Sequence, residues 1–292
     1  MGAVRFARLK NYPTYLRLIS ESRRKRWLKA LVLDLLLHDV HWSMFKSKKP
    51  NFTTLFLNAG AHVQHHYFFN AAPLKNELPT KNPNWYVSSD QDPVADALKL
   101  YDSIVGEYFS IRGVEVVLAT GLAQKPYGRT EFYYRLKTHE EFLKKLGINF
   151  ERVFPRMTRD FLVEFSNEKQ AQEAQALMAS ARVIGENTPL FGEIDNRGSS
   201  LFVTLTYASE VTAETRFSAN GKLLALFPEV SFVAIKNGMH QAEGFAFFTP
   251  GIAAYAPPEY SHVSKVGNMI RRYFTSSAGS LNQDVLPAKE KV

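Results

Sequence analysis

The stretch from Phe52 to Tyr67, FTTLFLNAGAHVQHHY, joins an apolar run to a cluster of histidines. Its first half is rich in β-branched and aromatic residues and lies between Pro50 and Gly60, which is typical of a buried strand that enters a sharp loop. Three of the eight histidines of the chain follow within five residues. Because ligand sites of open α/β sheets gather at the carboxyl ends of strands, this pattern predicts a site directly after the strand.

His62 and His66 are four residues apart, so a helical turn places both imidazoles on one face, where they can reach the same metal ion. His65 is the alternative ligand if the local loop turns the other way. The competing interpretation is that all three are partly exposed loop histidines without a ligand.

Helical and strand patterns alternate along the rest of the chain. Residues 1–45 are mostly helical in pattern, and residues 92–109 carry apolar side chains at helical spacing with Pro93 in the first turn. A second apolar strand pattern covers residues 114–121. A helix that leads into a buried strand is typical of a covered parallel sheet. The sequence therefore predicts an α/β fold with a mostly parallel sheet covered by helices.

The composition shifts between residues 152 and 207 and predicts a small inserted α+β subdomain. It contains a β-α-β-β pattern, with a strand at 160–165, a helix at 168–180 and strands around 191–194 and 201–207.

The core α/β domain is then expected in two parts, residues 1–151 and 208–274. The second part holds a strand pattern at 230–235 and a closing helix at 264–274. Residues 275–292 are polar and lack periodicity, so we expect a disordered tail.

Composition limits the function only loosely. The chain has 292 residues, is 45% hydrophobic and contains no cysteine, which excludes disulfides and thiolate metal sites. The net charge of +8 suits an anionic partner such as a phosphate ester, a nucleic acid or an acidic membrane surface. No run reaches the ~18 apolar residues that a transmembrane segment requires. The oligomeric state does not follow from these features.

The basic segment Arg23–Arg26 precedes an apolar stretch, as in a signal peptide. Lys29 and Asp34 interrupt that stretch and no small-residue cleavage site follows, so we reject this interpretation and expect a cytoplasmic location. No aromatic residues are interleaved with the arginines, which favours a solvated helix start over a nucleic-acid site.

Two further polar groups leave alternatives open. His38, Asp39 and His41 form either a second polar cluster or part of the surface. Arg156 and Arg159 either face an anion, to which arginine binds well, or take part in a structural ion pair with Asp160.

The strand and its histidines resemble the metal-binding segment of the alkaline phosphatase superfamily, closest to the type I phosphodiesterase/nucleotide pyrophosphatase branch. In that pattern a strand ends in an Asp, and a metal-binding His follows four residues later. The alignment places His62 at the Asp position and His66 at the His position. His240, in a Gly-bounded loop, resembles the late metal-binding His of the family. The resemblance implies a site for a divalent metal, zinc or alternatively manganese, with these three histidines as ligands; otherwise His240 is a loop histidine without a ligand.

This chain also departs from the family pattern. Thr120-Gly121 stands where the family has a metal-binding Asp-His pair. Thr120 and Gln124 can hydrogen-bond a ligand and, with Asn58, are the candidate substrate-binding residues. The resemblance runs from just before His62 to Phe274, and residues 1–50 show no strand with a nucleophile. We therefore expect either a fragment or a relative that has lost the phosphotransfer machinery, and no catalytic residue is assigned.

The resemblance implies a metal-dependent hydrolase of small phosphate, phosphodiester or sulfate esters, with weak or no activity if the chain is a fragment. The alternative is a non-catalytic relative that acts as an anion-binding or scaffold module. Nucleic acid is not the expected partner.

Overall fold

The computed structural model describes residues 5–281, with side chains as far as residue 276. The described residues form two compact units. The first unit draws on three parts of the chain, Met1–Gln64, Pro93–Lys125 and Met239–Val292. The second unit draws on two parts, His65–Asp92 and Pro126–Gly238.

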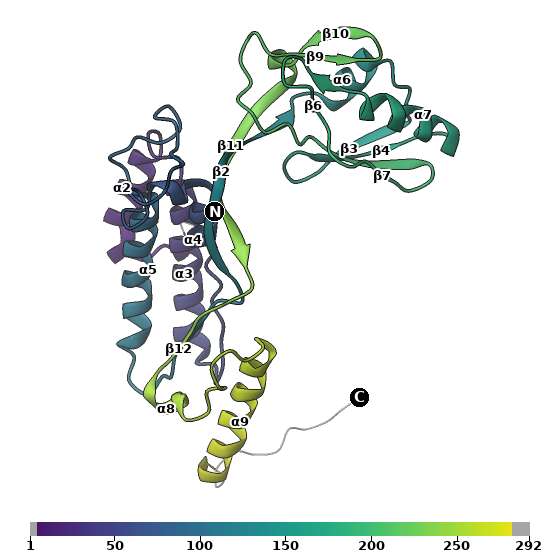
Figure 1. Ribbon diagram of the computed structural model, residues 1–292. Helices are drawn as coiled ribbons and strands as arrows, with labels where there is room; N and C mark the ends of the chain where they lie inside the picture. The colour runs from purple at the N-terminus through teal and green to yellow at the C-terminus, as the bar shows by residue number, and fades with distance from the viewer. Residues whose placement is uncertain (1–4, 282–292) are drawn as a thin grey trace. The chain divides into compact units, whose positions relative to one another are not determined.

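Three helices form the centre of the first unit. Helix α3 (Leu28–Lys48) packs against both α2 (Tyr12–Glu21) and α5 (Pro93–Phe109), as Figure 1 shows. Helix α5 begins at a proline, which suits the first helical turn because the missing N–H would have no partner there. Its buried side chains recur at helical spacing and face this core, namely Ala97, Leu100 and Ile104.

The rest of the first unit consists of short elements. Helix α4 (Ala59–Tyr67) starts in this unit, and the short 3-10 helix η1 (Leu9–Asn11) precedes α2. Strand β1 (Val117–Ala119) pairs antiparallel with β12 (Ala246–Phe248), which is followed by α8 (Pro250–Ala253). Helix α9 runs from Ser264 to Leu281, so residues 275–281 of the expected tail are helical. Residues 282–292 lie outside the described part of the chain.

The second unit contains two small four-stranded sheets. The first has the strand order β3-β4-β8-β7. Its strands are β3 (Arg152–Pro155), β4 (Asp160–Glu164), β8 (Ser200–Thr204) and β7 (Asp195–Asn196), and their pairings are antiparallel. The second sheet has the order β10-β9-β5-β6, with the strands β10 (Lys222–Ala225), β9 (Arg216–Ala219), β5 (Arg182–Val183) and β6 (Thr188–Pro189).

A hydrophobic core joins these sheets to helices α6 (His139–Leu146) and α7 (Glu168–Ala179). Alternate side chains of β4 and β8 are buried, as expected for strands with one face on a core, and they are Phe161, Val163, Leu201 and Val203. Short 3-10 helices η2 (Phe68–Asn70) and η3 (Phe227–Glu229) lie in the same unit.

The long strand β2 (Ala123–Leu136) pairs with the long strand β11 (Val230–Gln241), as Figure 1 shows. Most of each strand belongs to the second unit, and one end of each belongs to the first.

The predicted parallel α/β sheet is wrong. The described residues contain 39% helix and 23% strand, and the sheets are small and antiparallel. Residues 53–58 form irregular chain, and Phe56 is 76% exposed. Only Val117–Ala119 of the second predicted strand is a strand, and its partner runs antiparallel. An apolar run forms a strand only where another strand offers its backbone groups, and the sequence pattern does not specify that partner.

Candidate anion-binding site

The histidines of the expected metal site lie on two elements. His62 and His66 are one turn apart in α4, and His240 is near the end of β11. His62 keeps an exposed surface, yet desolvation by the protein atoms around it lowers the pKa of its imidazole. His62 and His240 belong to the first unit and His66 to the second. Among residues 5–281, no three His, Asp or Glu side chains gather closely enough to hold a metal ion. The zinc or manganese site therefore stays a prediction, and we assign no chemical step to a metal.

Asn58 lies where helix α4 begins, and a buried carboxylate holds this helix start. Asp34 accepts hydrogen bonds from the N–H groups of Asn58 and Ala59, at 3.3 and 2.8 Å. The Tyr101 hydroxyl donates to Asp34 at 2.6 Å and accepts from the Gly60 N–H at 2.7 Å. These contacts satisfy N–H groups that have no partner within the helix. Asp34 thus caps the N-terminus of α4 and fixes Asn58, which precedes the histidines.

Thr120 and Gln124 have different surroundings. Thr120 exchanges two hydrogen bonds with the backbone of Phe245: its N–H donates at 2.8 Å and its Oγ1 accepts at 2.9 Å. Gln124 Nε2 donates to the Ala61 carbonyl at 3.0 Å. Its Oε1 is buried and has no hydrogen-bond partner among the described residues. Thr120 therefore extends the pairing of β1 with β12, and the ligand-binding roles of both residues stay predictions.

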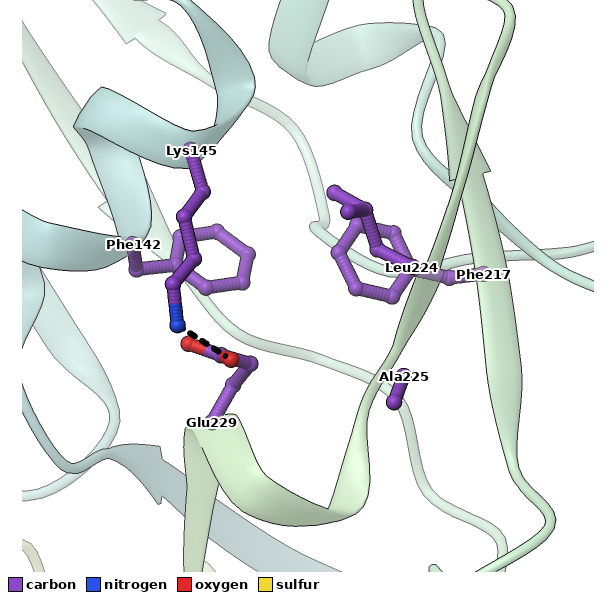
Figure 2. Close-up of a pocket in the computed structure, with 6 residues that line it drawn as sticks. All are labelled: Phe142, Lys145, Phe217, Leu224, Ala225 and Glu229. Carbon is purple, nitrogen blue, oxygen red and sulfur yellow. Dashed lines mark hydrogen bonds and ion pairs between the residues drawn. The ribbon is translucent and has the colours of Figure 1, made fainter.

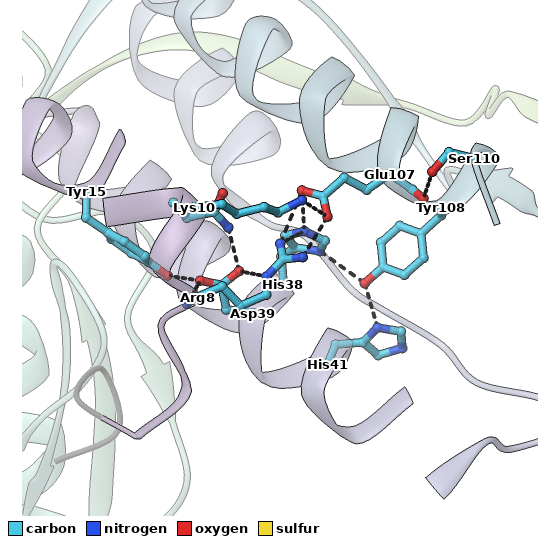
Figure 3. Close-up of polar contacts among 10 residues, drawn as sticks. Arg8, Lys10, Tyr15, His38, Asp39, His41, Glu107, Tyr108 and Ser110 are labelled. Atoms are coloured by element: carbon cyan, nitrogen blue, oxygen red, sulfur yellow. Dashed lines mark hydrogen bonds and ion pairs between the residues drawn. The ribbon is translucent and has the colours of Figure 1, made fainter. Parts of the chain in front are cut away.

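The first unit contains a buried polar network between α3 and α5, shown in Figure 3. Arg8 is its centre, with Nε 2.6 Å from an oxygen of Asp39 and Nη1 2.6 Å from an oxygen of Glu107. Lys10 also contacts Glu107 at 2.6 Å. Burial alone would raise the pKa of Glu107, but the hydrogen bonds from Arg8 and Lys10 outweigh it and lower the pKa to about 2. Asp39 has no exposed surface and also accepts from the Tyr15 hydroxyl at 3.0 Å.

A chain of hydrogen bonds leads from Arg8 to the surface through two histidines. Arg8 Nη2 lies 2.6 Å from His38 Nε2, and His38 Nδ1 lies 3.0 Å from the Tyr108 hydroxyl. The same hydroxyl is 2.7 Å from His41 Nδ1, and His41 Nε2 is 2.8 Å from the hydroxyl of exposed Thr53. Desolvation by burial is the main cause that lowers the pKa of both imidazoles, so both are neutral near pH 7.

The direction in which these hydrogen bonds are donated follows from Arg8, the first residue of the series. Because arginine only donates, His38 Nε2 accepts and His38 Nδ1 carries the proton, which it donates to Tyr108. Tyr108 then donates to His41 Nδ1, so His41 Nε2 carries the second proton and donates to Thr53. A general base would have to accept a proton from Thr53 instead. In this direction the network joins α3 to α5, and its last member donates to Thr53. The surface interpretation of His38 and Asp39 is wrong, because neither has exposed surface.

A second polar group, in the second unit, involves Arg159, which the sequence marked as a candidate anion ligand. The structure pairs Arg159 with Glu131 of β2, with 3.8 Å between Nη1 and Oε1. Arg129 lies 3.4 Å from the other oxygen of this buried carboxylate. The ion pair of Arg159 is thus with Glu131 and not with Asp160, which the sequence alternative named, and Arg156 is exposed.

Two tyrosines hold the cations of this group. The guanidinium of Arg159 lies 3.9 Å from the centre of the Tyr133 ring, and Lys236 Nζ of β11 lies 3.9 Å from the centre of the Tyr127 ring. Burial, together with a hydrogen bond to Glu131, raises the pKa of Tyr127. We call these six residues the β2 cation cluster: Tyr127, Arg129, Glu131, Tyr133, Arg159 and Lys236.

The β2 cation cluster contains three cations and one carboxylate, Glu131, and the structure pairs this carboxylate with Arg129 and Arg159. Arg159 Nη1 is buried, and 3.8 Å from Glu131 is too long for a hydrogen bond, so this donor has no hydrogen-bond partner among the described residues. A buried donor without an acceptor is costly, and a charged one more so. The arrangement can therefore accept an added anion.

Sequence reasoning missed most of this cluster. The available signal was the alternation of Tyr127, Arg129, Glu131 and Tyr133, which puts all four on one face of a strand. Lys236 comes from another strand, and no local pattern connects it to the others.

The second unit also has a small apolar cavity, drawn in Figure 2. Its volume is about 160 Å³, and its lining includes Phe142, Phe217 and Leu224 beside the ion pair of Lys145 with Glu229 at 2.8 Å. Ligand pockets usually measure roughly 300–1,000 Å³. The cavity is too small and too apolar to be the preferred candidate site.

No protein-family model, curated protein or solved structure matches the chain. None of the helices within residues 5–281 has both the length and the hydropathy needed to cross a bilayer.

Proposed function

We propose that this chain binds a small phosphate-bearing ligand through the β2 cation cluster, as the anion-binding alternative from the sequence expects. The observation that carries the proposal is the buried Nη1 of Arg159, a charged donor without a hydrogen-bond acceptor among the described residues. Guanidinium groups bind phosphate oxygens in pairs of short hydrogen bonds, so a phosphate oxygen is a suitable acceptor for this N–H group.

Glu131 explains how the cations stay in place before a ligand arrives. Its oxygens lie 3.4 and 3.8 Å from Arg129 and Arg159, which are long contacts compared with the ~2.7–2.9 Å of a charge-assisted hydrogen bond. A phosphate that reaches these donors at shorter distance is a better partner. Cation–π contacts of Arg159 with Tyr133 and of Lys236 with Tyr127 already restrict both side chains, so both lose less conformational entropy on binding.

The experiment is calorimetric titration at low salt with inorganic phosphate and with 1-naphthyl phosphate, and 1-naphthol serves as the uncharged comparison. We expect Arg159→Gln to weaken phosphate binding about tenfold or more, because it removes the unsatisfied donor. Arg156→Gln is the matched control, since it removes one exposed arginine three residues away and should leave the affinity unchanged. Lys236→Gln is a second variant that should leave the fold intact, because Lys236 contacts the Tyr127 ring from the neighbouring strand.

Glu131→Gln gives a test of opposite sign. Removing the competing carboxylate should raise phosphate affinity, whereas a cluster that serves only to hold β2 would gain nothing from it. No phosphate binding by the parent chain would overturn the proposal, and so would binding that both Arg159→Gln and Lys236→Gln leave unchanged.

The metal-dependent ester hydrolase stays a second proposal, supported by His62 and His66 one turn apart in α4 and by the lowered pKa of His62. The two proposals are separable, because binding at the β2 cation cluster needs no metal and should persist in EDTA. Binding that EDTA abolishes would favour the hydrolase proposal instead.

A further inference from the structure

Helix α2 and the short helix η1 before it expose a stripe of large apolar side chains. The stripe consists of Leu9, Tyr12, Leu16 and Ile19, with exposed fractions of 83, 43, 68 and 55%. Their spacing of three and four residues places them along one side of the helix. A different side of α2 buries Tyr15 and Leu18 in the first unit. The stripe is therefore not needed for the core of this unit.

Exposed cations lie at the C-terminal end of the stripe and in the turn that follows it. Arg17 lies on α2 itself, and the turn between α2 and α3 carries Arg23, Arg24 and Arg26, with Lys29 in the first turn of α3. The ion pair found in this segment joins Lys25 to Glu21, and none of the five exposed cations is paired within the described part of the chain. An apolar helix side flanked by cations is the pattern of segments that lie in the interface of an anionic bilayer.

We propose that this surface, defined as residues 9–29, binds an anionic membrane surface, with the apolar stripe at headgroup level and the cations against lipid phosphates. Charge decides between occupants: a second copy of the chain would bring the same cations together, which is repulsive, whereas anionic lipids complement them. Because α2 is already folded against α3, binding does not have to meet the ordering cost of an isolated peptide. The inference concerns the first unit and is independent of the β2 cation cluster.

The experiment measures co-sedimentation with phosphatidylcholine vesicles that contain phosphatidylserine, and with vesicles of pure phosphatidylcholine. We expect binding to the anionic vesicles only, and we expect added salt to weaken it. The triple variant Arg23→Gln/Arg24→Gln/Arg26→Gln should lose roughly a hundredfold in partitioning, at about fivefold for each cation. The control Lys169→Gln/Lys222→Gln/Arg271→Gln removes the same number of exposed cations elsewhere and should keep most of the binding.

A second pair of substitutions, Leu16→Gln and Ile19→Gln, tests the apolar stripe. Both side chains are exposed, so the fold should survive, which circular dichroism checks, while vesicle binding should fall about tenfold or more. Arg159→Gln, which impairs the other proposed site, should leave vesicle binding intact.

Equal binding to anionic and to neutral vesicles would overturn the proposal, and so would an equal loss of vesicle binding in the triple variant and in its control. Concentration-dependent dimerisation of the chain that Leu16→Gln abolishes would overturn it as well. An acidic polypeptide that competes fully with the anionic vesicles would also count against it, because lipid would then not be the preferred occupant.

Discussion

Arg8 donates from Nη2 to Nε2 of His38 across 2.6 Å, and this contact sets the direction of every hydrogen bond between there and Thr53. Arginine has no acceptor atom, so the neutral His38 ring must carry its proton on Nδ1. Tyr108 then passes the same direction on to His41.

The first prediction concerns the tautomers of these two rings. In ¹⁵N-labelled protein near pH 7, we expect His38 to be protonated at Nδ1 and His41 at Nε2, because the donors alternate along the chain from Arg8. Long-range ¹H–¹⁵N spectra distinguish the two forms. A His41 ring protonated at Nδ1 would contradict this direction, because His41 Nε2 would then accept from the Thr53 hydroxyl.

The second prediction concerns Tyr108, whose hydroxyl serves both histidines. Tyr108→Phe leaves one ring nitrogen of buried His38 and one of partly buried His41 without this partner, so we expect a loss of roughly 1–3 kcal/mol in the free energy of unfolding. Urea denaturation measures it. Tyr12→Phe is the matched control, because Tyr12 is partly exposed in the same unit and its hydroxyl has no hydrogen bond among those described. Equal stability of the two variants would show that the network contributes nothing.

The third prediction concerns pH. The pKa of Glu107 is lowered from 4.5 to about 2, so the folded state binds its proton less tightly than the unfolded state. Its contribution is therefore fully present above pH 4.5 and is lost as the pH falls towards 2. The difference corresponds to roughly 3 kcal/mol at most, since the side chain is 17% exposed.

Urea denaturation of the parent and of Glu107→Gln over this pH range measures the contribution. The gap between the two should be constant above pH 4.5 and should narrow below it. His38 and His41 add a separate effect, since their lowered pKa values favour the neutral rings in the folded state, and stability should fall as the pH drops below 6.5. A gap that is unchanged at pH 3 would contradict the ion pairs of Glu107.

The fourth prediction concerns zinc and the site of His62, His66 and His240. If this site exists, the chain reloaded after chelation should hold one zinc ion, and His62→Ala or His240→Ala should each abolish the binding, because three ligands are needed. Elemental analysis measures the metal content, and His262→Ala is a control at an exposed histidine outside the expected site. Zinc content that is negligible in the parent, or unchanged in both variants, would dismiss the site.

Local patterns in the sequence predicted several elements well. The helix expected at 92–109 is Pro93–Phe109, and the one expected at 168–180 is Glu168–Ala179. The strand expected at 160–165 is Asp160–Glu164. These elements depend on side-chain periodicity and on end signals such as Pro93, which lie within the element itself.

The sheet and the candidate site needed information that is not local. Residues 53–58 have the composition of a strand, but within residues 5–281 no strand pairs with them, and they are irregular. Arg159 stood out in the sequence as a candidate anion ligand, yet its partner Glu131 and the nearby Lys236 come from β2 and β11. The type of each residue determines its charge, so the net charge of +8 could be read from the sequence and indicated an anionic partner. Which charges meet depends on strand pairing between distant segments, and that pairing is settled by the packing of the whole unit.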